Sequence, residues 1–180
     1  VPTKEDHPIQ PRDPYGATKA CFEIYLATYH MLYGLEYTAF RYPNVYGPNQ
    51  NPFGEAGVVA IFAKAMLQDK PLTINGDGKQ IRDYVYVDDV VAANLMALEK
   101  NANGPLNLGT GLGTDVNQIF SQLRDIIGYK REATYGPAKD GEVHRSNLDS
   151  SQIHNDWNWA PKTALREGLA STVEFIRSSN

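Results

Sequence analysis

The sequence has too few cysteines for an internal disulfide, since Cys21 is the single one among 180 residues. Disulfides are typical of secreted proteins, so their absence favours a reducing, cytoplasmic setting. The chain also has no excess of basic residues, because its net charge is −4 at pH 7. Proteins that bind nucleic acid usually present a basic surface, so we expect no nucleic acid as a partner.

Long hydrophobic runs are missing as well. No apolar segment approaches the roughly 20 residues that a membrane-spanning helix needs, and residues 1–12 are polar and proline-rich, unlike a signal peptide. We therefore expect no membrane association. The four histidines show no metal-ligand spacing with one another or with Cys21, so we predict no metal site.

A glycine-rich strand-turn-helix, which would hold a dinucleotide pyrophosphate, is also absent. The nearest match is GTGLGT (Gly109–Thr114), which follows a predicted strand and opens a predicted helix. A polar connector comes after that helix, so no acidic ribose partner follows in a βαβ unit. We expect this segment not to bind phosphate.

Predicted helices and short strands alternate along the chain, which is typical of an α/β fold. Helices are expected at residues 15–34, 58–70, 90–100, 114–127, 150–157 and 164–177. Strands are expected at residues 35–42 and 106–109, and a strand–NGDG–strand hairpin at 72–87. Asp88 or Asp89 and Thr114 are the predicted helix caps, and residues 43–57 are predicted as a long loop.

The stretch DPYGATKA places a tyrosine four residues before a lysine at the start of a helix. Asp13 is a good N-cap and Pro14 suits the first helical position. Tyr15 and Lys19 then lie one turn apart on the same face. A nearby ammonium favours the ionised form of a phenol, so Tyr15 is a candidate general base toward a hydroxyl group.

The Tyr-x-x-x-Lys spacing by itself has a large false-positive risk. A second copy runs from Tyr135 to Lys139. This copy contains Gly136 and Pro137, so we expect it not to be helical and its two side chains need not meet. The first copy lies inside a capped helix, which distinguishes it.

Several longer motifs follow YGATK. They are YHMLYGLEYTAFRYPNVYGPNQNPFGEAGVVAIFAKAM, INGDGKQIRDYVYVDDVVAAN, the NLGTG strand and the W-x-P segment Trp159–Pro161. With these motifs the chain resembles the extended short-chain dehydrogenase/reductase family over essentially its whole length. Within that family it is most similar to nucleotide-sugar epimerases of the UDP-glucose 4-epimerase type.

The resemblance implies the fold and the ligands. Residues 1–45 would end an NAD-binding Rossmann domain, and residues 46–180 would form a small α/β lobe that binds the nucleotide sugar, with 85–100 able to return to the Rossmann sheet. The family's glycine-rich NAD loop and catalytic Ser or Thr would precede Val1. We therefore expect a C-terminal part of a longer enzyme that lacks its N-terminal Rossmann half, is inactive alone, and forms a homodimer when complete.

The resemblance also assigns roles to residues. Tyr15 would exchange the proton of the sugar's 4-hydroxyl as the reaction passes through a 4-keto sugar. Lys19 would hold the nicotinamide ribose of NAD, and Pro43 would lie against the nicotinamide. The diphosphate and uracil of a UDP-sugar would be bound by Asn44, Gly57, Val58, Leu72, Thr73, Ile74, Asn75 and Arg82. Without the resemblance, Pro43 and Asn44 would indicate only a turn that ends a strand.

The connector KDGEVHRS would close over the nucleotide through Lys139, Glu142 and Arg145. Lys139 and Glu142 stand where the family usually has arginine and aspartate. Lysine is a point charge and cannot make the paired contacts of a guanidinium, so the resemblance implies a weaker phosphate contact at Lys139, which Arg145 could replace. Ser146 would lie beside the sugar's C2 substituent, where a small residue leaves room for an N-acetyl group.

Four functions therefore remain open at this stage. The chain could belong to an epimerase that interconverts UDP-glucose and UDP-galactose, and also their N-acetyl forms. It could belong to a nucleotide-sugar 4,6-dehydratase, whose extra acid pair would lie upstream of residue 1, or to a UDP-glucuronate decarboxylase. It could also be a non-catalytic fragment that binds a UDP-sugar.

Overall fold

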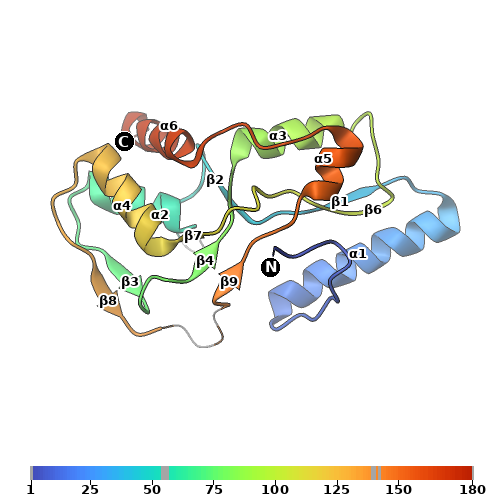
Figure 1. Cartoon of the computed structure of the whole chain (residues 1–180), viewed down its shortest axis with the longest axis horizontal. Helices are drawn as coiled ribbons and strands as arrows, with labels where there is room; N and C mark the ends of the chain where they lie inside the picture. The colour runs from blue at the N-terminus through green and yellow to red at the C-terminus, as the bar shows by residue number, and fades with distance from the viewer. Residues whose placement is uncertain (1, 54–56, 139–140, 142, 180) are drawn as a thin grey trace.

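The computed structural model describes residues 2–53, 57–138, 141 and 143–179. They form an α/β structure, as the sequence predicts (Figure 1). The helices are α1 (Pro14–Tyr33), α2 (Val58–Leu67), α3 (Val87–Met96), α4 (Val116–Ile127), α5 (Ser151–Trp157) and α6 (Leu165–Ser178). The strands are β1 (Thr38–Arg41), β2 (Asn44–Tyr46), β3 (Thr73–Asn75), β4 (Ile81–Arg82), β5 (Tyr84–Tyr86), β6 (Gly104–Asn107), β7 (Thr114–Asp115), β8 (Thr134–Gly136) and β9 (Arg145–Ser146).

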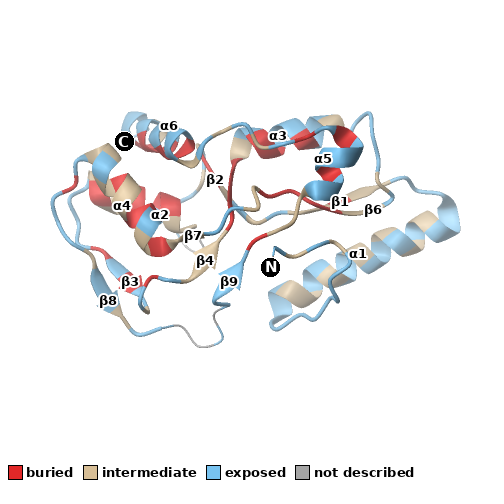
Figure 2. Cartoon of the chain, viewed as in Figure 1, coloured by how far each residue is buried: buried red, intermediate tan, exposed pale blue. Residues whose placement is uncertain are grey.

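Helix α1 is defined by its caps, as the sequence predicts. The Asp13 carboxylate accepts a hydrogen bond from the Gly16 N–H at 2.6 Å, and Gly34 ends the helix in the left-handed region with φ 70°. No residue of α1 is buried, and Figure 2 shows the whole helix in the colours of exposed and intermediate residues. Its exposed apolar side chains are Tyr15, Phe22, Ile24, Tyr25, Tyr29, Met31, Leu32 and Tyr33.

Strands β1 and β6 form a parallel pair, from Thr38 opposite Gly104 to Arg41 opposite Asn107. In Figure 1, α1 lies on one side of this pair and α3 and α5 lie on the other. One hydrophobic core fills the space on the α3 and α5 side, with buried residues Val85, Val90, Ala93, Leu106, Leu108, Ile153, Trp157 and Trp159. The domain boundary expected at residue 45 stays a prediction. Residues 104–108 and 153–159, which follow that boundary in the sequence, pack against β1, which precedes it.

A second core lies against α2, α4 and α6. Its buried members include Tyr46, Phe62, Met66, Ile74, Ile119, Leu123, Leu169 and Val173. Strand β5 links the two cores, because Tyr84 and Tyr86 belong to this core whereas Val85 belongs to the other. This alternation follows from the opposite directions of successive side chains in a strand.

The predicted NGDG hairpin is wrong. β3 pairs in parallel with β8, and β4 lies between β7 and β9, so the two segments flanking NGDG belong to different sheets. The turn is instead held by α4, since the Asn117 backbone N–H donates to the Gly78 carbonyl and its side chain donates to the Asp77 carbonyl. Gly76 and Gly78 both have positive φ, a conformation that glycine adopts readily, so these residues form a turn although the segments on its two sides do not pair with each other.

Three local predictions are also corrected. Strand β2 lies within the segment predicted as a loop, where it pairs with β5. Helix α3 begins at Val87, so Asp88 and Asp89 lie in its first turn and do not cap it. Asp115, not Thr114, caps α4, and its carboxylate and the Gln118 side chain form a reciprocal capping box.

Candidate functional site

The Tyr15 and Lys19 side chains meet on one face of the first turns of α1. The Lys19 ammonium lies over the Tyr15 ring, 5.0 Å from its centre. Tyr15 is 69% exposed, so both groups stand on an open surface. The spacing in the sequence therefore correctly predicts that the phenol and the ammonium are neighbours, with a cation–π contact between them.

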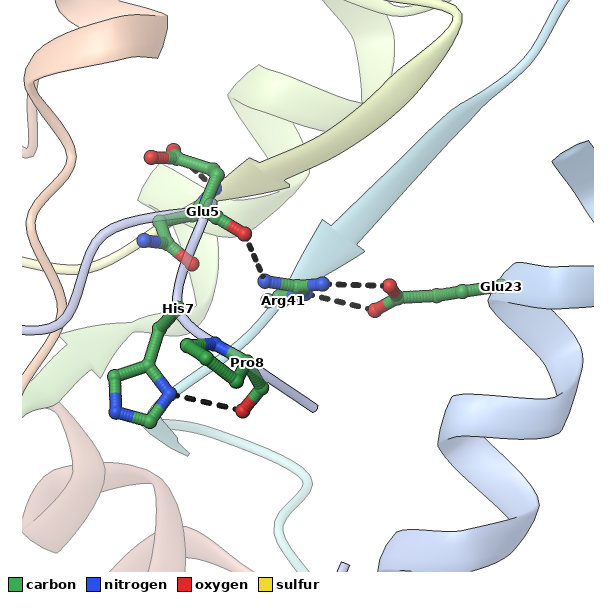
Figure 3. Close-up of polar contacts among 6 residues, drawn as sticks. Glu5, His7, Pro8, Glu23 and Arg41 are labelled. Atoms are coloured by element: carbon green, nitrogen blue, oxygen red, sulfur yellow. Dashed lines mark hydrogen bonds and ion pairs between the residues drawn. The ribbon is translucent and has the colours of Figure 1, made fainter. Parts of the chain in front are cut away.

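An ion pair holds α1 against β1. Arg41 donates to both carboxylate oxygens of Glu23, at 2.8 and 2.7 Å, and also to the Glu5 carbonyl at 2.9 Å (Figure 3). The hydrogen bonds that Arg41 donates to the Glu23 carboxylate raise the pKa of Arg41. Pro43, the residue expected against the nicotinamide, follows Arg41 by two positions. Strand β1 thus lies between the helix that carries Tyr15 and the segment that contains Pro43 and Asn44.

A cleft of about 410 Å³ opens between the start of α2, β3, β4 and the start of α4. It brings together seven of the eight residues expected to bind the diphosphate and the base: Asn44, Gly57, Val58, Thr73, Ile74, Asn75 and Arg82. The eighth, Leu72, is 6% exposed and lies in the second core, not on the cleft wall. The volume lies within the range of small-molecule sites.

The cleft can accept an anion. Gly57 is the N-cap of α2 in an extended conformation and no side chain caps the helix, so the first N–H groups of α2 are available at this wall. A Cβ on Gly57 would come within 2.6 Å of the Gln50 side-chain amide, which would then have to move. Arg82 adds a positive charge to the lining of the same cleft.

The Arg82 guanidinium is oriented by backbone groups. It donates to the Ile81 carbonyl at 2.9 Å and to the Val143 carbonyl at 2.6 Å. Strand β9 runs beside it, with Ser146 opposite Arg82 and Arg145 opposite Ile81. Arg145 and Ser146 are both exposed and do not line the cleft. Lys139 and Glu142 lie outside the described residues.

The GTGLGT loop already binds an anion of its own chain. Asp83 is fully buried, and its carboxylate accepts the N–H groups of Thr110 and Gly111, both at 3.0 Å, and the Thr110 hydroxyl. The Gly109 N–H donates to the Ser150 hydroxyl at 2.7 Å. Three donors that a phosphate would use therefore have protein partners, in agreement with the expectation that this loop does not bind phosphate.

Two polar residues of the cleft were missed in the sequence. Gln80 and Tyr84 line it together with Arg82. The three residues follow one another at intervals of two, the period at which side chains of an extended segment share a face. Applying that period outward from Arg82 would have found both. Ile61, Phe62 and Val116 complete the apolar part of the wall.

Within the described ranges, no group of three or more His, Cys, Asp or Glu side chains could hold a metal ion. No helix among the described residues is long and apolar enough to cross a membrane.

Comparison with known proteins gives the family. The sequence model of the NAD dependent epimerase/dehydratase family matches residues 1–109. The chain belongs to this family. Among the curated members, a putative UDP-glucose 4-epimerase of Methanocaldococcus jannaschii is 44% identical over 180 residues, which cover 100% of this chain and 58% of that protein.

Solved structures of family members match the whole architecture. The UDP-glucose 4-epimerase of Thermotoga maritima, solved with UDP-glucose, is 50% identical with a TM-score of 0.97, over 99% of this chain and 58% of the other. A UDP-N-acetylglucosamine 4-epimerase of Methanobrevibacter ruminantium, solved with UDP-N-acetylmuramic acid, is 33% identical with a TM-score of 0.96, over 100% and 58%. The fold is that of the C-terminal part of extended short-chain dehydrogenase/reductase epimerases. The chain thus spans less than two thirds of these relatives.

Proposed function

We propose that this chain binds the nucleotide-sugar substrate and supplies the acid–base tyrosine of an NAD-dependent epimerase that interconverts UDP-glucose and UDP-galactose at C4. The observation that supports this most strongly is the cleft of about 410 Å³, in which seven of the residues expected to bind a UDP-sugar line one cavity. The likeness to a UDP-glucose 4-epimerase solved with UDP-glucose supports the same substrate class.

In this proposal each wall of the cleft has its own task. The N–H groups at the start of α2 and the Arg82 guanidinium bind the diphosphate, which places negative charge where the helix dipole and the cation favour it. Thr73 and Asn75, the exposed residues of β3, bind the base. Anchored at its nucleotide end, the sugar can turn while its C4 stays within reach of Tyr15.

Tyr15 takes the proton of the 4-hydroxyl and returns it to the 4-keto sugar. Its exposure of 69% leaves the phenol open to a substrate, and the Lys19 ammonium lies over its ring, 5.0 Å from the ring centre. Bound NAD supplies the reversible acceptance of a hydride. Lys19 and Pro43 would hold its nicotinamide end. The GTGLGT donors are already used by Asp83 and Ser150, so its pyrophosphate would be held by the N-terminal Rossmann half.

Titration with UDP and with NAD tests the binding part of the proposal. The chain by itself should bind UDP, because the cleft is formed by its own residues, and should not bind NAD measurably. No binding of UDP would refute the proposal. Binding of NAD to this chain alone would refute the inference that the pyrophosphate site lies elsewhere.

Tyr15→Phe tests the catalytic part in the enzyme completed by its N-terminal half. The variant should keep the UDP affinity and lose turnover of UDP-galactose by about 100-fold or more, because a general acid–base group is removed. Unchanged turnover would exclude Tyr15 from this role. The products of the unsubstituted completed enzyme separate the alternatives. A 4-keto-6-deoxy sugar would identify a dehydratase, and a UDP-pentose would identify a decarboxylase.

Acceptance of N-acetyl sugars is a further part of the proposal. Ser146 is exposed on β9, in register with Arg82, and has a small side chain that leaves space beside the sugar. Turnover of UDP-N-acetylglucosamine and UDP-glucose should be compared in the completed enzyme, where failure of the N-acetyl sugar to react would reject this specificity. The homodimer and the cytoplasmic location stay predictions.

A further inference from the structure

Tyr84 stands at the point where two clefts meet. It lines the cleft of about 410 Å³ together with Asn44 and Arg82. It also lines a second cleft of about 330 Å³ on its other side, formed mainly by residues 110–114 and 161–165. Only 6% of Tyr84 is exposed, so its ring is packed in the second core while its edge reaches both cavities.

The buried tyrosines of this core differ in what their hydroxyl groups do. Tyr46 donates to the Leu165 carbonyl at 3.3 Å, and Tyr129 donates to the Lys70 carbonyl at 2.6 Å. The Tyr84 hydroxyl makes no hydrogen bond with any residue that the structure describes, and the same holds for Tyr86, which lines neither cleft. Among the described residues, only Gln50 Oε1 is a buried side-chain polar atom without a partner, so the Tyr84 hydroxyl is not sealed from water although its ring is packed. A ligand that enters the cleft can therefore replace that water as the hydrogen-bond partner of Tyr84.

The surroundings of Tyr84 favour an acceptor with negative charge. Burial raises the pKa of Tyr84 to about 12, the Arg82 charge opposes this rise and the Asp115 carboxylate adds to it. The hydroxyl therefore keeps its proton at neutral pH and can only donate to an anion. Arg82 and the start of α2 make the first cleft the side on which an anion is stabilised.

The ring is held in a fixed orientation before any ligand arrives. Its centre lies 6.3 Å from that of the Tyr46 ring, in an edge-to-face arrangement at 78°. In strand register, Tyr84 is opposite Asn44, another residue of the same cleft wall. A donor held in this way loses little conformational entropy when it forms a hydrogen bond.

We propose that the Tyr84 hydroxyl donates a hydrogen bond to a phosphate oxygen of the nucleoside diphosphate bound beside Arg82. This inference rests on the proposed function, because it takes the UDP part of the substrate as the ligand. Arg82 contributes charge, and Tyr84 contributes a neutral donor with a fixed direction. Tyr84 is thereby a contact residue for the diphosphate and not only a part of the core.

Two matched substitutions test this in the chain as it exists. Tyr84→Phe removes one oxygen that has no hydrogen-bond partner among the described residues, so the variant should keep its fold. Tyr46→Phe removes an oxygen of the same core that is already bonded to Leu165. Titration calorimetry with UDP should give a Kd about tenfold higher for Tyr84→Phe, since hydrogen bonds to charged groups are the stronger ones, and an unchanged Kd for Tyr46→Phe.

Uridine is the matched ligand, because it carries the base and ribose without phosphate. Its affinity, measured by competition, should be the same for Tyr84→Phe and the original protein. An unchanged UDP affinity in Tyr84→Phe, an equal loss for UDP and uridine, or an equal loss in Tyr46→Phe would each overturn the inference and leave the proposed function standing. Failure of the unsubstituted protein to bind UDP would overturn both.

Discussion

The carboxylate of Glu23 on α1 accepts two hydrogen bonds from the Arg41 guanidinium on β1, with a shortest distance of 2.7 Å. The two side chains are only 22% and 23% exposed, so water weakens this pair less than an ordinary surface ion pair. No residue of α1 is buried, so apolar packing holds this helix only weakly. The ion pair therefore contributes much of the contact between the helix that carries Tyr15 and the strand that leads to Pro43.

Glu23→Gln should loosen α1 from β1. The amide keeps the shape of the side chain but loses the charge and one accepting oxygen, which should cost about 1–3 kcal/mol in local stability. Hydrogen exchange of the α1 amides measures this loss directly. Glu174→Gln is the control, because its pair with Arg177 is 72% and 52% exposed and should change nothing measurable. Equal exchange of α1 in both variants would show that the pair does not hold the helix.

Asp83→Ala should destabilise the whole chain. The buried carboxylate accepts hydrogen bonds from Thr110, Gly111 and Leu148, so its removal leaves donors of two separate segments without partners. We expect a loss of about 2–4 kcal/mol in the free energy of unfolding, measured in urea. Asp69→Ala removes an exposed carboxylate paired with Arg131 and should have little effect. A small loss in Asp83→Ala would mean that the loop does not depend on this anion.

Much of the fold could be predicted because local chemistry and burial agree. The Asp13 cap, Pro14 and Gly34 mark α1 in the sequence, and the structure has the same ends. The prediction of a β3–β4 hairpin was wrong for a physical reason. NGDG has the residues of a hairpin turn, but tertiary packing pairs β3 with β8 and β4 with β9. Two-residue strands such as β9 carry no periodic pattern that a sequence could reveal.

The candidate site could be predicted mainly through the family resemblance, which assigned the residues that bind the diphosphate and the base. The structure gathers Gly57, Arg82 and Thr73, three of the residues assigned in this way, in one cleft. Leu72 was wrongly predicted to bind the ligand, because the resemblance of a segment to its family does not say which of its side chains point into the core. Tyr84 was missed because an aromatic residue of an apolar strand is normally part of the core. It differs from Tyr46 in lining the cleft and in having no hydrogen-bond partner for its hydroxyl among the described residues.

Gly168→Ala should destabilise α6 although alanine is the better helix former. A Cβ at Gly168 would overlap the Tyr46 hydroxyl and come within 2.8 Å of the Tyr86 ring. Overpacking of this kind costs about 1–3 kcal/mol, more than the gain of up to about 1 kcal/mol in helix propensity. Urea unfolding measures the balance. Combination with Tyr46→Phe should recover part of the loss, and no recovery would place the strain elsewhere.

Stability should fall steeply at alkaline pH because of the buried tyrosines. Burial raises the pKa of Tyr84 to about 12 and raises the pKa of Tyr46 as well, whereas a phenol in the unfolded chain titrates near 10. Above pH ~10 the unfolded state loses these protons and the folded state keeps them, so the contribution is complete below ~10 and disappears as pH rises through about 12.

For Tyr84 this loss amounts to about 2 kcal/mol between pH ~8 and ~11.5, by the linkage of proton binding to unfolding. Lysines also titrate in this range, so the measurement compares Tyr84→Phe with the unsubstituted chain by urea unfolding at both pH values. The difference in unfolding free energy between the two pH values should be smaller in Tyr84→Phe by roughly that amount. The same difference in both proteins would mean that the Tyr84 phenol is not held in its neutral form by the core.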